Sequence, residues 1–123
     1  MNVFDAPYIS LGTYRKSGVM VATPVWAAPL NDGLIVFSAG NAGKVKRLRN
    51  DSKAQIAVCD VRGKLLGEWR DAEAFIVEDD TTVSAGLDAL RKKYGWQMWL
   101  ADTGAKLTGK FNKRTYIKIQ PAS

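Results

Sequence analysis

Histidine is absent from this chain of 123 residues, and cysteine occurs only once. Without histidine there can be no Ser-His or Cys-His nucleophile pair, no histidine proton relay and no imidazole ligand for zinc or iron. We therefore expect no transition-metal site. Any demanding chemistry would have to come from an organic cofactor.

The one cysteine, Cys59, lies in the apolar run IAVCDV. It has no intrachain partner for a disulfide, so we expect a buried thiol in a reducing compartment. The first ten residues lack the basic and then apolar order of a secretory signal, and no run of about 18 apolar residues is present to cross a bilayer. These features predict a cytoplasmic protein without a membrane partner.

The composition, 46% hydrophobic and 24% charged, is that of a globular protein. The length suits one domain, which we place at residues 1–123. A chain of this size buries roughly two thirds of its unfolded surface, so a second subunit would add useful stability.

Short apolar runs separated by turn residues predict a mainly β protein. The turns contain Ser17 with Gly18, and Asn31 with Asp32 and Gly33. Because LIVF in the third run is apolar on both faces, the pattern favours a small closed or split barrel. Pro24 lies in the second run, where it requires a strand edge, a bulge or a backbone that faces a ligand. The six predicted strands cover residues 8–14, 19–28, 34–39, 53–61, 66–77 and 112–119.

Two helices are predicted. Residues 79–95 show helical spacing of apolar side chains, with acidic residues before the first turn, basic residues in the last turn and Gly95 as a C-terminal cap. The second helix follows Gly43, where Val45 and Leu48 are three residues apart and can both point inward. The rest of this short helix is cationic.

Positive charge is concentrated in residues 43–53, which hold five of the basic residues and one acid, Asp51, in a chain of formal net charge +6. A strand that runs through glycines into a helix presents free N–H groups to an anion. Lys44 in the first turn opposes the helix dipole, a conflict that a bound phosphate would cancel. The segment therefore predicts a phosphate site.

Two other interpretations of the cationic segment stay open. KVKRLR could be an ordinary solvent-exposed helix face, as most charge clusters are. It could also bind nucleic acid, with nearby aromatic rings stacking on bases, although the sequence contains no recognisable nucleic-acid module. GNAGKV is not a phosphate loop of the Walker type, because it lacks the spacer and the Ser or Thr after lysine.

The order of several segments resembles the split β-barrel flavoproteins related to pyridoxamine phosphate oxidase, in particular the small deazaflavin-dependent oxidoreductases. The resemblance runs from about Tyr8 to Ile119. It is carried above all by TPVW at residues 23–26, AGKVKRLR at residues 42–49 and KYGW at residues 93–96.

This resemblance implies a six-stranded split β-barrel of the FMN-binding type, assembled as a homodimer. The cofactor would be FMN or the deazaflavin coenzyme F-420. The residues that match its binding site are Thr23, Pro24, Val25, Trp26, Phe37 and Ser38 around the ring, and Lys44, Lys46 and Arg47 at the phosphate. Relatives often carry serine or arginine before the phosphate lysine, where this chain has Ala42 and Gly43.

The function implied is an oxidoreductase that transfers hydride between this cofactor and an unknown small substrate. Pyridoxamine phosphate oxidase activity itself is excluded, because that enzyme uses a histidine that this chain lacks. The alternative is a carrier that binds a flavin or a tetrapyrrole without turnover. We expect Trp69, Trp96 and Trp99 to serve in packing, in the core or at an interface, as most tryptophans do. Tyr94 and Trp96 also lie where a second subunit would complete the pocket.

Overall fold

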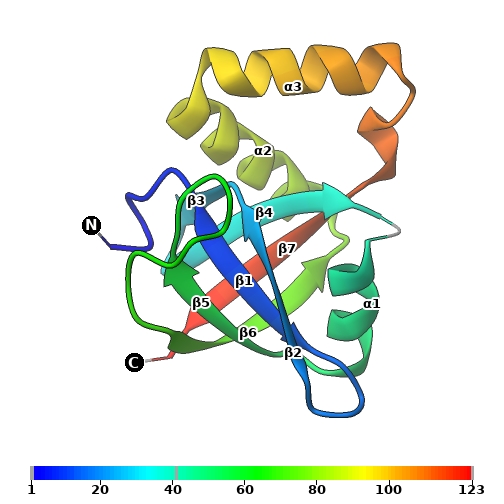
Figure 1. Cartoon of the computed structure of the whole chain (residues 1–123). Helices are drawn as coiled ribbons and strands as arrows, with labels where there is room; N and C mark the ends of the chain where they lie inside the picture. Colours follow the sequence, from blue (N-terminus) through cyan, green and yellow to red (C-terminus); the bar gives the residue numbers. More distant parts are fainter. Residues whose placement is uncertain (1, 41, 123) are drawn as a thin grey trace.

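The computed structural model describes residues 2–40 and 42–122. Its main feature is one antiparallel sheet that curls into a barrel, with helices on one side and at one end (Figure 1). The strands are β1 (Ile9–Tyr14), β2 (Met20–Val25), β3 (Ala27–Leu30), β4 (Gly33–Ala39), β5 (Lys53–Val58), β6 (Arg70–Val77) and β7 (Arg114–Pro121). The helices are α1 (Gly43–Asn50), α2 (Asp80–Tyr94), α3 (Trp96–Leu107) and the 3-10 turn η1 (Phe111–Lys113).

The described chain has seven strands, so the expectation of six was wrong. Residues 19–28 were predicted as one strand, but the structure divides this run at Trp26 into β2 and β3. The two halves pair with different neighbours: β2 pairs with β1, and β3 pairs with β4. A pattern of apolar residues cannot show that a strand changes partner in its middle.

The strand order is β2-β1-β5-β6-β7-β4-β3, so β2 and β3 form the two edges of the sheet. Only Trp26 separates these two strands in sequence. The sheet must therefore curl until its edges meet at this residue. Pro24 and Pro29 both lie on these edge strands, where a missing N–H breaks no ladder.

Two apolar clusters lie on opposite faces of the sheet. Leu34 and Val36 of β4 point into the barrel, where they join the main core. Ile35, between them, points outward to a second cluster under α2 and α3. This alternation explains why β4 is apolar on both faces, as the sequence predicted.

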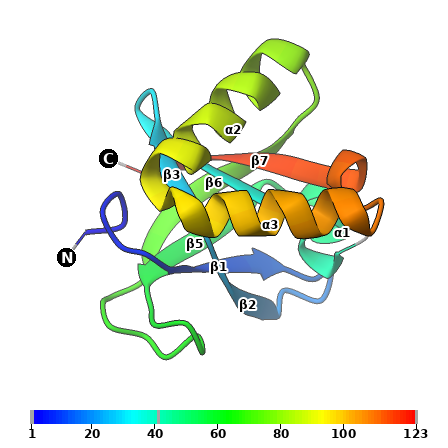
Figure 2. The ribbon, with the colours of Figure 1, turned by 90° about the horizontal axis from the view of Figure 1, so that it is seen from above.

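Helix α2 packs on β3 and β4, and α3 packs mainly on α2 and η1. Figure 2 shows α3 lying across this side of the barrel. Trp96 and Trp99 are 71% and 64% exposed, so they do not pack in the core of this chain, and their packing at an interface stays a prediction. Met98 and Asp102 instead form the buried face of α3. No helix in the described ranges is long and apolar enough to span a bilayer.

The end of α2 fixes the N-terminal segment against the barrel. The Lys93 ammonium donates to the carbonyl oxygens of Phe4, Ala6 and Ala27, at 3.2, 2.8 and 2.5 Å. Burial lowers the pKa of Lys93. One side chain thus connects the N-terminal segment to the first residue of β3.

The Tyr94 hydroxyl makes a similar connection one residue later. It donates to the Pro7 carbonyl at 2.8 Å and accepts from the Ala27 N–H at 2.9 Å. The Tyr94 ring stacks on Trp26, with centroids 4.8 Å apart and planes inclined by 14°. Tyr94 therefore holds the corner at which the barrel closes.

Stability should fall in alkaline solution because of Tyr94. Burial raises the pKa of its hydroxyl from 10.0 to about 12. A group whose pKa is raised on folding stabilises the native state below the unfolded pKa, and this contribution is lost as pH rises through the folded pKa. We expect the parent chain to lose about 1.4 kcal/mol per pH unit relative to Tyr94→Phe between these two values.

The measurement is chemical unfolding of both chains from pH 8 to 12. The Phe variant is the matched control, because it keeps the ring and the neighbouring Lys93. Parallel stability curves for the two proteins would contradict this assignment.

Candidate functional site

Lys44 lies in the first turn of α1, half-buried against the end of β4. Its ammonium donates to the Ser38 hydroxyl, with Nζ and Oγ 3.2 Å apart. Burial lowers the pKa of Lys44, and the nearby charge of Arg47 lowers it further. The two predicted site residues Ser38 and Lys44 are therefore in contact.

Arg47 is one helical turn further along α1, on the same face as Lys44. Its Nε donates to Oγ1 of Thr13, a fully buried β1 residue, at 2.6 Å. Burial is the main cause that lowers the pKa of Arg47, followed by the charge of Arg15. Thr13 was not predicted as a site residue, because it is distant in sequence and only the packing of α1 on β1 brings it here.

Glycine at position 43 leaves room for Arg47. A Cβ at this position would lie 2.8 Å from Nη1 of Arg47. The guanidinium therefore folds back over the first turn of α1. This turn contains no acidic residue, and the N-cap residue Ala42 offers no side-chain cap for its N–H groups.

Within the described chain, neither Lys44 nor Arg47 forms an ion pair. Their polar partners from other elements are the hydroxyls of Ser38 and Thr13. Two partly buried cations that repel each other are costly unless an anion compensates them. The site therefore has the chemistry of an anion receptor.

The other predicted phosphate ligand, Lys46, lies on the exposed face of α1. Arg49 is also exposed and approaches Glu78 at 3.8 Å. The structure thus separates the cations of α1 into an inward pair and an outward pair.

The predicted residues of β2 alternate between the two faces of the sheet. Val25 belongs to the barrel core, while Pro24 is exposed on the opposite face. Thr23 shares the inner face with Val25. Its Oγ1 is buried and has no hydrogen-bond partner in the part of the chain that is described. This hydroxyl is unsatisfied unless a ligand reaches it.

Trp26 and Phe37 form an aromatic group with Tyr94 on the outer face, under α2. The rings of Trp26 and Phe37 meet edge to face, with centroids 6.3 Å apart and planes inclined by 71°. Neighbouring strand residues point to opposite faces, so Phe37 points away from the face that carries Ser38. The predicted set is thus divided between the two faces of β4.

A cleft of about 520 Å³ opens at the end of β4. Its lining combines the end of this strand with residues near the start of β7: Phe37, Ser38, Ala39, Gly40, Ala105, Lys110, Lys113 and Arg114. A Cβ on Gly40 would lie 2.7 Å from the Lys113 carbonyl oxygen, so glycine allows the two segments to approach. Sequence reasoning missed the three cations of this cleft, although KFNKR was visible as a basic run.

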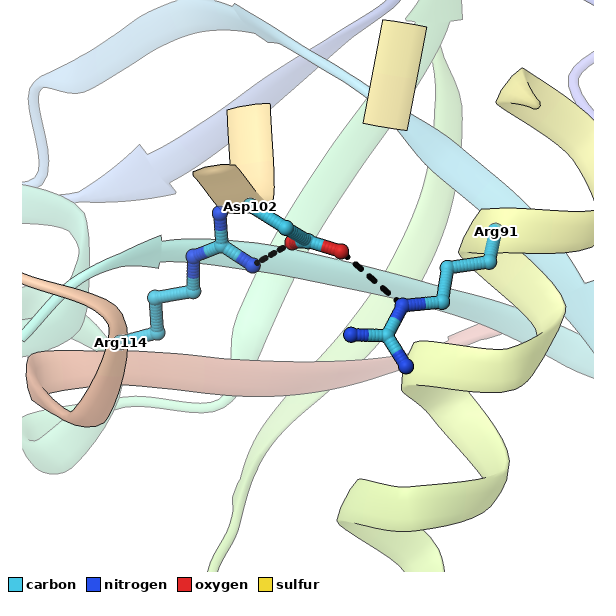
Figure 3. Close-up of polar contacts among 3 residues, drawn as sticks. All are labelled: Arg91, Asp102 and Arg114. Carbon is cyan, nitrogen blue, oxygen red and sulfur yellow. Dashed lines mark hydrogen bonds and ion pairs between the residues drawn. The ribbon is translucent and has the colours of Figure 1, made fainter. Parts of the chain in front are cut away.

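The arginine of this cleft is fixed by a buried ion triad (Figure 3). Asp102 accepts from Nη1 of Arg114 at 2.7 Å through one oxygen and from Nε of Arg91 at 2.9 Å through the other. The Arg114 guanidinium also lies over the rings of Phe37 and Phe111, at 4.4 and 4.9 Å. These contacts connect α2, α3 and β7.

Neither a protein-family model nor a curated protein matches the sequence. Solved structures do match the fold. HutZ, the heme storage protein of Vibrio cholerae, superposes with a TM-score of 0.71 at 13% identity, covering 97% of this chain and 84% of HutZ. A protein described as an F420 reductase superposes with a TM-score of 0.62 at 15% identity, covering 98% of this chain and 91% of its own.

A candidate pyridoxamine 5′-phosphate oxidase of Listeria innocua gives a TM-score of 0.62 at 13% identity, with coverage of 95% and 85%. Identities this low establish the likeness of the fold and nothing of the activity. The protein therefore has the split-barrel fold of the pyridoxamine phosphate oxidase-like proteins, as its sequence resemblance implied.

Proposed function

We propose that this protein binds the phosphate of FMN or of coenzyme F-420 at the start of α1 and acts as an oxidoreductase on a small substrate. The observation that carries the proposal is the inward pair Lys44 and Arg47, which has hydroxyl partners and, within the described residues, no carboxylate partner. A phosphate dianion would compensate both charges and accept from the uncapped N–H groups of the first turn.

The residues present fit such a cofactor at two further points. Gly43 lets the Arg47 guanidinium lie over the first turn, where it would meet a bound phosphate. The buried Thr23 hydroxyl has no partner among the described residues, as expected of a group that hydrogen-bonds to a ligand. Thr23 and Ser38 would orient the cofactor, and Lys44 and Arg47 would hold its phosphate. When bound, the cofactor supplies the ring that accepts or donates hydride.

Lys44→Ala should weaken FMN binding by about tenfold or more, since a charge-assisted hydrogen bond contributes roughly 1.5 to 3 kcal/mol. The matched control is Lys46→Ala, which removes the same side chain from the exposed face of the same helix. We expect that variant to change the affinity by about twofold or less. Titration of each protein with FMN and with F-420, followed by fluorescence, provides the measurement.

Equal losses in the two variants would show a diffuse basic surface instead of a phosphate site, and would overturn the proposal. Steady-state assays with reduced FMN and reduced F-420 then separate an enzyme from a carrier, because a carrier binds the cofactor without transferring hydride.

Tetrapyrrole binding is the second candidate, and the fold shared with HutZ is the observation that favours it. The sequence argues against it, because the chain has no histidine to serve as an axial ligand and its single cysteine is buried. Titration with haem tests this alternative. A sharp Soret shift at stoichiometric haem, together with no change on adding FMN, would favour the carrier.

A further inference from the structure

The cleft at the end of β4 is cationic and has no acidic residue in its lining. Lys110 and Lys113 are exposed at its rim, whereas the Arg114 side chain is only 7% exposed. Its volume of about 520 Å³ lies within the range usual for small-molecule sites. Both the charge and the size suit a small anion.

The ion triad does not neutralise Arg114. One carboxylate, Asp102, is shared by two guanidinium groups, so the triad keeps one positive charge. Arg114 uses Nη1 for Asp102, and no acceptor for its Nε or Nη2 is found within the described chain. Arg114 therefore contributes net positive charge to the lining of the cleft.

The lining also has an apolar part. Phe37 and Ala105 contribute to it, and the face of the Phe37 ring toward Arg114 is covered by the guanidinium, which lies 4.4 Å from the ring centroid. A carboxylate attached to an apolar body would place its charge on the basic side chains and its apolar part against the remaining surface of Phe37 and Ala105.

From these features we propose that the cleft binds a carboxylate with an apolar body. If the protein is the oxidoreductase proposed above, this cleft identifies the class of its substrate, an apolar organic acid, and that role rests on the proposed function. The binding of the carboxylate does not depend on the proposed function. Ser38 lines the cleft, but its hydroxyl contacts Lys44 on the opposite face of β4 from the Phe37 ring, so the two anion sites adjoin at the end of this strand and lie on opposite faces of it.

The test uses the full chain without cofactor and two probes of the same shape, 2-naphthoate and its neutral amide, 2-naphthamide. We expect the carboxylate to bind at least about tenfold more tightly than the amide at low salt. Lys110→Ala combined with Lys113→Ala should weaken naphthoate binding by about fivefold to tenfold, since two exposed charge contacts are removed. Calorimetric titration measures both quantities.

The matched control is Lys64→Ala with Lys92→Ala, which removes two exposed lysines that do not line the cleft. It should leave naphthoate affinity unchanged. Equal affinities for acid and amide, or equal losses in the two double variants, would overturn the proposal. All four lysines are exposed, so an unchanged unfolding midpoint is expected and is checked in each variant.

A parallel titration with FMN separates this proposal from the proposed function. We expect Lys110→Ala with Lys113→Ala to keep its FMN affinity and Lys44→Ala to keep its naphthoate affinity. Naphthoate binding without FMN binding would contradict the proposed oxidoreductase function and support the carboxylate site in the cleft. Full competition between the two ligands, with one double variant weakening both, would reduce the two sites to one and overturn the cleft as a separate site.

Discussion

Replacing Asp102 by alanine is expected to lower the free energy of unfolding by about 3 kcal/mol and the melting temperature by roughly 10 °C. The carboxylate is buried and accepts from two arginines, of which Arg114 is itself buried. Removing it leaves the Arg114 guanidinium charged, desolvated and without its anion. Arg91 is 43% exposed, so water screens its share of the loss.

A second change distinguishes an unpaired charge from a packing defect. Replacing Asp102 by leucine and Arg114 by methionine removes both members of the buried pair, and should recover most of the stability, because hydrophobic replacement of a whole buried pair is often neutral. The control is Asp88→Ala, an exposed carboxylate on α2, with an expected change within about 0.5 kcal/mol. If Asp102→Ala matched that control in chemical unfolding, the triad would have no structural role.

The same substitution, glycine to alanine, is expected to have opposite effects at positions 33 and 104. A Cβ on Gly33 would lie 2.2 Å from the Ile119 carbonyl oxygen, which belongs to the backbone of the paired strand β7. The two strands would have to separate, so we expect a loss of about 3 kcal/mol or more. A Cβ on Gly104 meets nothing within 4 Å on the exposed side of α3.

Gly104→Ala should therefore stabilise the protein by about 0.5 to 1 kcal/mol, which is the helix propensity difference between the two residues. Each variant serves as the control for the other, because the atoms added are the same. Thermal and urea unfolding of the two proteins provide the values. A mild effect at position 33 would mean that the start of β4 and the end of β7 can move apart at little cost.

The parts of the fold that depend on local pattern could be predicted from the sequence. Helix α2 was predicted because acidic residues precede it, apolar residues repeat at helical spacing and Gly95 follows it. In the structure Asp79 accepts from the Thr82 N–H at the start of the helix, and Gly95 has a positive φ of 55° at its end. Helix α1 was predicted because Val45 and Leu48 share one face, and both are buried. The turn at Asn31 has the positive φ of 55° that its residue type allows.

Helix α3 could not be predicted in the same way. Its buried face is Met98 and Asp102, and the second of these is a carboxylate that is buried only because two distant arginines meet it. Its other large apolar residues, Trp96, Trp99, Leu100 and Leu107, are exposed, so they form no buried stripe at helical spacing. The ion pairs of Asp102 with Arg91 and Arg114 depend on the tertiary structure, which a local sequence pattern cannot predict.

Only part of the candidate site could likewise be predicted from the sequence. Lys44 and Ser38 were predicted together and are in contact, because a tight connection joins the strand that holds one to the helix that holds the other. The role of Thr13 could not be predicted, since it depends on α1 packing on β1. The cleft residues Lys110, Lys113 and Arg114 were missed for the same reason, because the pairing of β7 with β4 brings this segment to the end of β4.

We expect the single residue between β2 and β3 to limit strand exchange between molecules of this protein in concentrated solution. While Trp26 joins the two outermost strands, neither can swing outward to recruit a strand from another molecule. A circular permutant with new ends at Trp26 would keep every side chain yet release both edges at once. We expect such a chain to polymerise through strand exchange. The unbroken connection through Trp26 would then protect the protein from forming fibres.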